Sequence, residues 1–384
     1  MKRSASIVLL LSASLVGAWS SPGEATPALA CGRWSVVASP NVGEGGSVLS
    51  GVAALSKSGA WAVGSYFTGS TYRSLAEHWD GGAWSVVQTP NQGNRTNTLG
   101  AVATVSSNDV WAVGFYDDGT TFRTLALRWD GSKWSIVPTP NVGTGENALT
   151  AVAVVSANDI WAVGYHQDPT APPRVTLALH WDGSSWSVVD TPNVGTGENF
   201  LWSVTARTSR DVWAVGSYSV PWFQTLTEHW DGRSWMVVPS PDQGDGDNVL
   251  YAAVALGPGS AVAVGNWLVG NGNDTLSQHW DGKSWTIVPT PSPGGYLNFL
   301  TGVAAYSSRD IWAVGWASSQ PFAATRALAL HWNGTEWSRG KPADVGSESN
   351  ALAAVARVPG TNRFWAVGNY EQNSINQTLV EFGC

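Results

Sequence analysis

One tetrapeptide returns through the sequence at nearly constant spacing. Trp-Ala-Val-Gly occurs six times, and the variant Val-Ala-Val-Gly occurs once, ending at Gly265. The seven copies end at Gly64, Gly114, Gly164, Gly216, Gly265, Gly315 and Gly368, so successive copies lie 50, 50, 52, 49, 50 and 53 residues apart. A period of this length is typical of repeat architectures in which each copy is one supersecondary unit. The copies fill the chain after its first thirty residues, which leaves no room for a second domain.

Each copy contains four short segments with strand character. In the third copy they are 149–155, 160–164, 175–181 and 186–189, and they are separated by turns rich in Asp, Asn, Ser and Gly. Four strands per repeat are typical of a propeller blade. Only neighbouring sheets can cover the two apolar faces of such a sheet, so the copies are expected to stack into a closed ring. The sequence therefore predicts an all-β protein, a single seven-bladed β-propeller over residues 31–384.

The two ends of the repeat region complement each other. The last copy stops at 379–384, which aligns with 75–80, and the first begins at 31–34, which aligns with 81–84. The last copy thus lacks its fourth strand and the N-terminus supplies it, a 1+3 closure. Cys31 and Cys384, the two cysteines of the chain, fall at aligned positions that a peptide bond joins in other repeats. We expect a Cys31–Cys384 disulfide there, with two free thiols as the alternative.

The first thirty residues have the order of a secretory signal. Lys2 and Arg3 precede an apolar run, and a small-residue stretch leads to Ala28-Leu29-Ala30. This predicts a signal peptide over 1–30 and a secreted protein. Cleavage after Ala18 and a lipid anchor on Cys31 are the alternatives. After residue 30 no apolar run reaches the roughly 20 residues of a membrane span, and a net charge of −8 argues against a nucleic-acid partner.

Most Trp, His and Asp residues recur at fixed repeat positions and are predicted to be scaffold. Nineteen of the twenty-four Trp residues belong to three repeat positions, where large flat rings suit a core between blades. His78, His180, His229, His279 and His331 share one position, at which Arg128 and Phe382 also stand. Asp residues before the second strand and in the Asp-Gly turn are expected to accept hydrogen bonds from their own backbone.

The blade motif resembles that of known propellers. His-Trp-Asp-Gly-x-x-Trp, as at 180–186, is similar to the blade motif of bacterial seven-bladed propeller lectins, and the Trp-Ala-Val-Gly strands are similar to those of exported bacterial propellers. The resemblance covers the mature chain and rests mainly on residues that form the fold. It implies sugar binding between blades, and no lectin sugar contact maps onto a residue of this chain.

Aromatic residues that depart from the repeat gather in the fourth to sixth copies. Trp202 and Tyr251 begin innermost strands where other copies have small residues, and Phe200, Tyr296, Phe299 and Phe322 enter from adjacent loops. The candidate ligand-binding residues are Trp202, Trp222, Phe223, Tyr251, Trp267 and Trp316. Such rings suit stacking on sugars or apolar ligands. The alternative is that they only plug the channel mouth or pack loops.

Acidic loop residues give two weaker hypotheses. Asp242, Asp245 and Asp247 crowd a Gly-rich loop and could bind Ca²⁺, although their spacing is not that of a recognised calcium loop. Other loop carboxylates, such as Asp117, Asp118 and Asp274, could serve as an acid–base pair, but no spacing selects one. No nucleophile elbow, P-loop, dinucleotide fingerprint or zinc motif is present.

Three functions remain open from the sequence. The favoured one is a non-catalytic extracellular protein that binds a carbohydrate or similar ligand through the aromatic residues of repeats four to six. The second is a secreted polysaccharide lyase or glycosidase-like hydrolase that uses loop carboxylates, and the third is a protein-docking scaffold.

Overall fold

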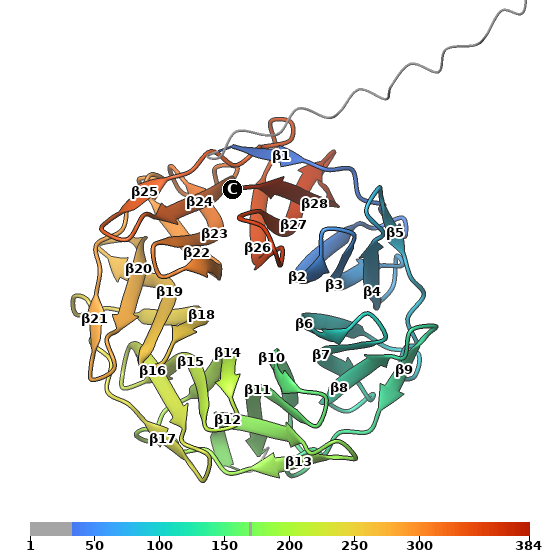
Figure 1. Ribbon diagram of the computed structural model, residues 1–384, viewed down its shortest axis with the longest axis horizontal. Coiled ribbons are helices and arrows are strands. Elements are labelled where there is room, and N and C mark those ends of the chain that lie inside the picture. The colour runs from blue at the N-terminus through green and yellow to red at the C-terminus, as the bar shows by residue number, and fades with distance from the viewer. Residues whose placement is uncertain (1–32, 169–170) are drawn as a thin grey trace, which may run out of the picture.

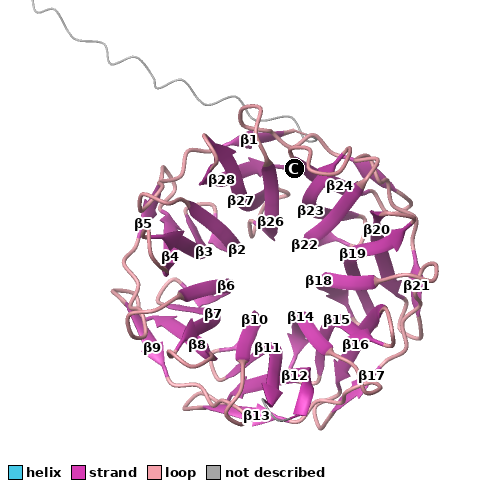
Figure 2. Cartoon of the chain, turned by 180° about the vertical axis from the view of Figure 1, so that it is seen from behind, coloured by secondary structure: helices cyan, strands magenta, loops and turns pink. Residues whose placement is uncertain are grey.

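A computed structural model describes residues 33–168 and 171–384, and this part of the chain forms strands and no helix. The predicted signal peptide and Cys31 lie outside the described residues. The strands form four-stranded antiparallel sheets arranged radially around a central opening (Figure 1). The view from behind shows the same ring, with loops at the rim and between the sheets (Figure 2). The all-β prediction is confirmed, and the architecture is consistent with a β-propeller.

Each sheet runs from an innermost strand beside the opening to a short outermost strand. The innermost strands are β2 (Ser47–Ser56), β6 (Asn97–Ser106), β10 (Asn147–Ser156), β14 (Asn199–Thr208), β18 (Asn248–Gly257), β22 (Leu297–Ser307) and β26 (Asn350–Arg357). The second strands are β3 (Gly59–Phe67), β7 (Asp109–Asp117), β11 (Asp159–Asp168), β15 (Asp211–Ser219), β19 (Ser260–Val269), β23 (Asp310–Ser318) and β27 (Phe364–Gln372). The third strands are β4 (Tyr72–Trp79), β8 (Phe122–Trp129), β12 (Ala171–Trp181), β16 (Phe223–Trp230), β20 (Gly272–Trp280), β24 (Arg326–Trp332) and β28 (Ile375–Gly383). The outermost strands are β5 (Trp84–Val86), β9 (Trp134–Val137), β13 (Trp186–Val189), β17 (Trp235–Val237), β21 (Trp285–Ile287), β25 (Trp337–Arg339) and β1 (Trp34–Val36).

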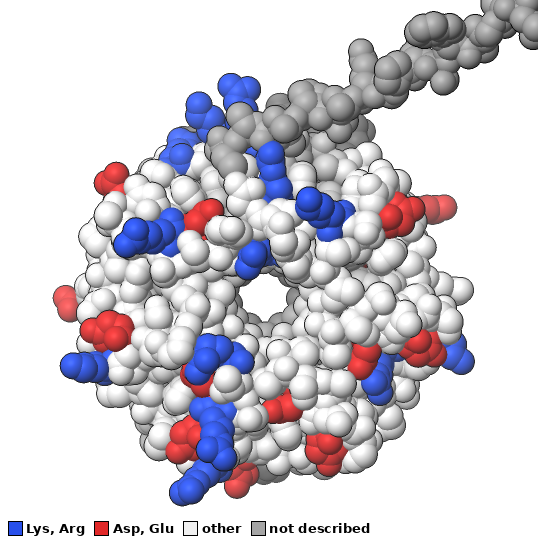
Figure 3. Space-filling view, in the orientation of Figure 1, with Lys and Arg blue, Asp and Glu red and all other residues white. Residues whose placement is uncertain are grey.

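Side chains, rather than a continuous hydrogen-bond ladder, hold neighbouring sheets together. Each of seven hydrophobic clusters in the described residues combines side chains from two adjacent repeats. One backbone pair, Asn273 with Leu297, links β20 to β22 in parallel and merges two sets of four strands into an eight-stranded sheet. The space-filling view shows that the opening passes through the middle of the ring (Figure 3).

The chain ends meet in one sheet. β1 pairs with β28 in antiparallel register, with Trp34 opposite Gly383 and Val36 opposite Glu381. The sheet order β1-β28-β27-β26 is the arrangement that the sequence predicted for the incomplete last copy.

The glycine that ends each Trp-Ala-Val-Gly segment is required by a close approach of two strands. A Cβ atom on Gly64 would collide with the carbonyl oxygen of Val48 on β2, where the β2–β3 register shifts between Leu49 and Gly51. Any larger residue would push the innermost strand away from its neighbour.

The repeated Trp residues pack between repeats, as predicted. The ring of Trp111 is fully buried, with its centroid 4.8 Å from that of Trp181 and 5.4 Å from that of Trp186 in the next repeat. The Asp-Gly turns also behave as expected, because Asp182 accepts backbone hydrogen bonds from Ser184 and Ser185.

The Asp residues that precede the second strands correct one expectation. Asp159 binds the Nε2 atom of His180 at 2.9 Å, and Asp310 binds His331 in the same way. In the second repeat Arg128 replaces the His and donates to both carboxylate oxygens of Asp109. These carboxylates thus link the second strand to the third instead of capping only their own turn.

Candidate functional site

Two sets of loops lie together on one face of the ring. In each repeat, the end of the second strand, which leads into the loop before the third strand, contacts the loop that enters the repeat. Examples are the backbone hydrogen bonds from Gln167 N to Glu146 O at 2.7 Å and from Leu268 N to Asp247 O at 2.7 Å. We call this side of the ring the loop face, and the candidate binding residues come from it.

An aromatic cavity lies on the loop face across repeats four to six, and we call it the aromatic pocket. Its volume is about 260 Å³, close to the lower end of the roughly 300–1,000 Å³ that small-molecule sites occupy. Its aromatic walls are Phe200, Trp202, Phe223, Tyr251 and Phe299. These rings come from the first residues of innermost strands and from the start of β16.

The rings of this pocket belong to a longer aromatic row along the inner strands. Trp202 stacks on Phe200, with ring centroids 5.1 Å apart and 14° between the planes. Tyr251 follows at 6.3 Å from Trp202, and Phe299 at 6.4 Å from Tyr251. Trp316 stacks on Phe299 at 4.4 Å, and Tyr165 extends the other end at 5.2 Å from Phe200. The row therefore crosses four repeats, from the third to the sixth.

Polar atoms are buried beside these rings without partners. Asn266 lines the aromatic pocket with 3% of its surface exposed, and its Oδ1 atom has no hydrogen-bond partner. The Nε1 atom of Trp202 is likewise buried and unpaired. An unpaired buried polar atom is costly, so we take these two atoms as the candidate hydrogen-bonding groups of the site.

The structure brings together three of the six predicted ligand-binding residues. Trp202, Phe223 and Tyr251 line the aromatic pocket, and Trp316 reaches it through its stack on Phe299. Trp222 lies in the β15–β16 loop, does not line the pocket, and is 55% exposed.

Trp267, one of the predicted ligand-binding residues, does not line the aromatic pocket. Its ring packs against Gly244 and a hydrophobic cluster between repeats four and five. It follows the strand glycine by two residues, the position of Tyr66, Tyr116, Tyr218 and Tyr370 in other repeats. Because alternate strand residues point to opposite sides, the pocket receives the preceding residue, Asn266.

Asn266 is a candidate site residue to which no pattern in the sequence pointed. It stands directly after the strand glycine, where the other repeats have Ser65, Phe115, Tyr165, Ser217, Trp316 and Asn369. This position varies from repeat to repeat while the next one is mostly Tyr. A position that varies between repeats, beside one that is mostly Tyr, is the sequence signal that could have pointed to Asn266.

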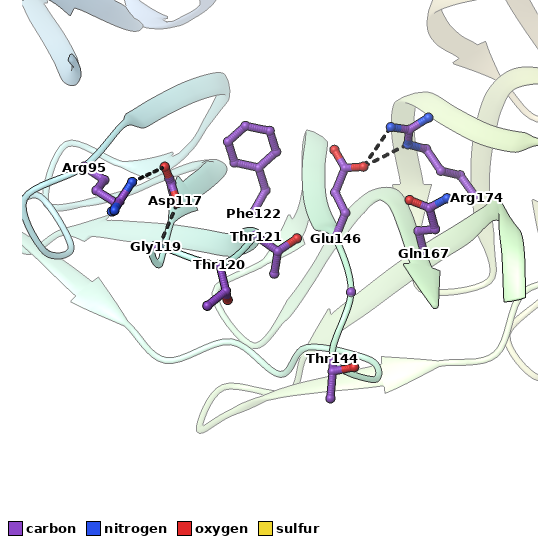
Figure 4. Close-up of a pocket in the computed structure, with 11 residues that line it drawn as sticks. Arg95, Asp117, Gly119, Thr120, Thr121, Phe122, Thr144, Glu146, Gln167 and Arg174 are labelled. Carbon is purple, nitrogen blue, oxygen red and sulfur yellow. Dashed lines mark hydrogen bonds and ion pairs between the residues drawn. The ribbon is translucent and has the colours of Figure 1, made fainter. Parts of the chain in front are cut away.

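A second cavity, the polar pocket, lies on the loop face between repeats two and three. Its volume is about 590 Å³. Figure 4 shows Phe122 on one wall, Thr120, Thr121 and Thr144 below, and ion-paired side chains on either side. Those pairs are Arg95 with Asp117 at 3.6 Å and Arg174 with Glu146 at 2.9 Å.

Arg174 and Tyr165 connect the polar pocket to the aromatic pocket. Arg174 also pairs with Glu198 at 3.3 Å, and its guanidinium carbon lies 5.6 Å from the Tyr165 ring centre and 6.0 Å from that of Phe200. The hydroxyl of Tyr165 donates to Glu146 at 3.2 Å. Burial and the Glu146 charge raise the pKa of Tyr165 to about 12.

The proposed calcium ligands do not converge. Asp242 accepts a hydrogen bond from the backbone of Thr225, as Asn141 does from Thr124 two repeats earlier. Asp247 accepts one from the backbone of Phe223. Within residues 33–168 and 171–384 no group of three or more His, Cys, Asp or Glu side chains is placed to hold a metal ion. Asp242 and Asp247 therefore accept hydrogen bonds from the backbone of the neighbouring strand β16.

Comparison with known proteins identifies the fold. No family model matches the sequence, and no curated protein matches it. YCF48, solved with a D1 peptide, is similar over 95% of this chain and 100% of its own, with 15% identity and a TM-score of 0.56. An ulvan lyase of polysaccharide lyase family PL25, solved with a glucuronate–sulfated rhamnose oligosaccharide, is similar over 89% of this chain and 95% of its own, with 10% identity and a TM-score of 0.57.

A lectin from Aleuria aurantia, solved with Fucα1-6GlcNAc, has a TM-score of 0.48 at 15% identity, over 79% of this chain and 97% of its own. Within the described residues no helix has the length and apolarity of a membrane span.

The similarity to YCF48 and to the ulvan lyase covers most of all three chains. The chain thus shares the β-propeller fold of these two proteins.

Proposed function

We propose that the protein is a non-catalytic carbohydrate-binding propeller whose site is the aromatic pocket. The observation that carries the proposal is the pairing of stacked rings with open polar atoms. Trp202 and Phe200 offer a flat aromatic surface, while Trp202 Nε1 and Asn266 Oδ1 are unpaired beside it. A sugar ring presents an apolar face for stacking and hydroxyl groups that both donate and accept hydrogen bonds.

The charges around the site favour a neutral glycan. Asp247 is the charged residue among those that line the aromatic pocket, and the chain as a whole carries −8. Both would repel uronic acid or sulfate groups. The ulvan lyase that shares the fold was solved with an acidic oligosaccharide, so we expect a different preference here.

The ionisable groups between the two pockets support binding over catalysis. A general acid or base works best when its pKa lies near the working pH. The pKa of Tyr165 is about 12, and Glu146 is held by both Arg174 and Tyr165. These contacts fix the wall of the polar pocket, over which the continuation of a longer glycan would extend.

We also propose seven blades for the ring. The eight-stranded sheet divides into β18–β21 and β22–β25, which a single strand pairing, Asn273 with Leu297, connects within the described residues. With this division, every copy of the repeat corresponds to one four-stranded blade. The hydrophobic clusters between adjacent repeats are also seven in number.

Export and a disulfide at the seam complete the proposal. The order of residues in 1–30 supports secretion, with Cys31 at the start of the mature chain. Cys384 is 3% exposed and follows Gly383, which pairs with Trp34. A bond from Cys31 to Cys384 would join the ends where other repeats have a peptide bond.

A glycan array with the mature protein tests the proposed function. We expect binding to neutral glycans and a loss of about tenfold in Asn266→Ser. Serine stands at this position in two other repeats, at Ser65 and Ser217, so the fold should tolerate it. Trp222→Ala, outside the pocket, is the matched control and should bind normally. Absence of glycan binding, or equal binding by Asn266→Ser, would reject the proposal.

A further inference from the structure

The seam between repeats six and seven differs from the other boundaries of the ring. Elsewhere, the Trp before the tight turn of one repeat packs against the second strand or third strand of the repeat before it. Trp129 lies 4.9 Å from Trp61, Trp280 lies 5.0 Å from Trp213, and Trp332 lies 4.7 Å from His279 between ring centroids. Six boundaries have such a ring.

At the seam this Trp is replaced by Gly383. The strand register establishes the equivalence, because Trp79 stands opposite Trp84 in the first repeat and Gly383 stands opposite Trp34 at the seam. Trp312, on the other side of the boundary, contacts Trp34 at 5.3 Å and its own neighbour His331 at 4.6 Å. The indole that the repeat would place over Trp312 and His331 is missing from the sequence.

A cavity of about 300 Å³ lies at this boundary, and we call it the seam pocket. Trp312, His331 and Cys384 contribute to its walls, together with Asp310, which His331 binds at 2.9 Å. A cavity of this size is large enough for a small ligand.

The outer strand beside the seam pocket also departs from the repeat. Other repeats have two apolar residues after the Ser or its equivalent, as at Val86-Val87 and Val188-Val189, but repeat six has Arg339-Gly340, followed by Lys341. All three residues line the cavity, and the two cationic side chains are exposed. A Cβ on Gly340 would lie 2.6 Å from the Trp312 ring, so the valine of other repeats would press on that wall.

We propose that the seam pocket binds a planar aromatic ligand that carries an anionic group such as a carboxylate. At the six other boundaries a Trp ring occupies the equivalent position. By analogy, an indole-sized ring would lie against Trp312 and His331 in the seam pocket. Arg339 and Lys341 supply charge for the anion, and Asp310 is already engaged by His331. This site is separate from the aromatic pocket, because the two cavities share no lining residue.

Calorimetric titration of the mature protein with indole-3-acetate tests this inference. We expect saturable binding that is about tenfold weaker for indole-3-acetamide, which has the same ring without the charge. The double variant Arg339→Val, Lys341→Gln restores the residues of the first repeat, Val86 and Gln88. It should fold normally by thermal unfolding and lose indole-3-acetate affinity by a similar factor.

Two controls locate the binding. Lys283→Gln removes a cation from a tight turn in another repeat, and Asn266→Ser changes the aromatic pocket; neither should alter the indole-3-acetate affinity. No saturable binding at about 1 mM ligand, equal affinity for the acetamide, or unchanged binding by the double variant would each overturn the proposal.

Discussion

The indole of Trp202 lies flat against the phenyl ring of Phe200, with 14° between the ring planes. This contact fixes the orientation of Trp202 while its buried Nε1 atom remains without a partner. Trp202 can therefore supply both an aromatic surface and a hydrogen-bond donor to a ligand, and the two contributions can be measured separately.

Replacing Trp202 with Phe or Ala separates stacking from hydrogen bonding. Trp202→Phe keeps an aromatic ring and removes the donor, so we expect glycan affinity to fall by about two- to tenfold. Trp202→Ala also removes the ring and should weaken binding further. Calorimetric titration with the best glycan from the array measures both. Equal affinities of Trp202→Phe and the wild type would show that Nε1 does not contact the ligand.

Trp267 is expected to matter for stability and not for binding. Trp267→Ala removes a ring packed between two repeats and should lower the free energy of unfolding by about 3 kcal/mol, the lower end for Trp truncation. Trp267→Tyr introduces the residue of four other repeats and should be nearly neutral. Urea unfolding and glycan titration of both variants check this. If the Trp267→Tyr variant folds normally but binds glycan more weakly, Trp267 contributes to ligand binding and this prediction is wrong.

Buried carboxyl groups predict how stability depends on pH. Glu77 and Glu228 are fully buried without hydrogen-bond partners, and burial raises the pKa of each carboxyl to about 8. The folded state thus holds protons that the unfolded state releases near its usual pKa of 4.5. The contribution to stability is most favourable below about pH 4.5, declines as the pH rises toward 8, and stays low above it.

The matched variant for these carboxyls comes from the fifth repeat. Gln278 occupies the same position and donates to the carbonyl of Pro241 at 2.7 Å. Glu77→Gln with Glu228→Gln should raise the Tm at pH 9 by a few degrees and flatten its decline between pH 5 and 8. Scanning calorimetry across this range measures it. A wild-type Tm that rises between pH 5 and 8, with no change in the double variant, would contradict the assignment.

The proposed seam disulfide gives a covalent and a thermodynamic prediction. The intact mature protein should have the mass of an oxidised chain that begins at Cys31, and reduction should add about two daltons. Reduction or Cys384→Ser should lower stability by a few kcal/mol, because the bond closes almost the whole chain. A thioether-linked lipid on Cys31, or two alkylatable thiols in the native protein, would exclude the bond.

The architecture was predictable from two features of the sequence: the regular repeat and the incomplete last copy. Six Trp-Ala-Val-Gly copies and one Val-Ala-Val-Gly copy required stacked sheets, and the missing fourth strand of the last copy required β1 to pair with β28. The pairing of Asp159 with His180 was not predicted. The two residues lie 21 positions apart, and only the antiparallel pairing of β11 with β12 brings them together.

The candidate site was predictable in its sector and only partly in its residues. Departures from the repeat pointed to Trp202 and Tyr251, and the structure places both in the wall of one cavity, each as the fourth residue of its innermost strand. Trp267 stands out in the sequence as a Trp where four other repeats have Tyr, but its ring packs against Gly244 and the hydrophobic cluster between repeats four and five. Asn266 was missed because a single polar residue carries no motif, and its burial without a partner is visible only in three dimensions.

A crystal structure of the mature protein with its best neutral glycan tests the central claim most directly. We expect a sugar ring against Trp202, with hydroxyl groups within hydrogen-bond distance of Trp202 Nε1 and Asn266 Oδ1. A glycan bound elsewhere on the ring, with those two atoms still unpaired, would contradict the account.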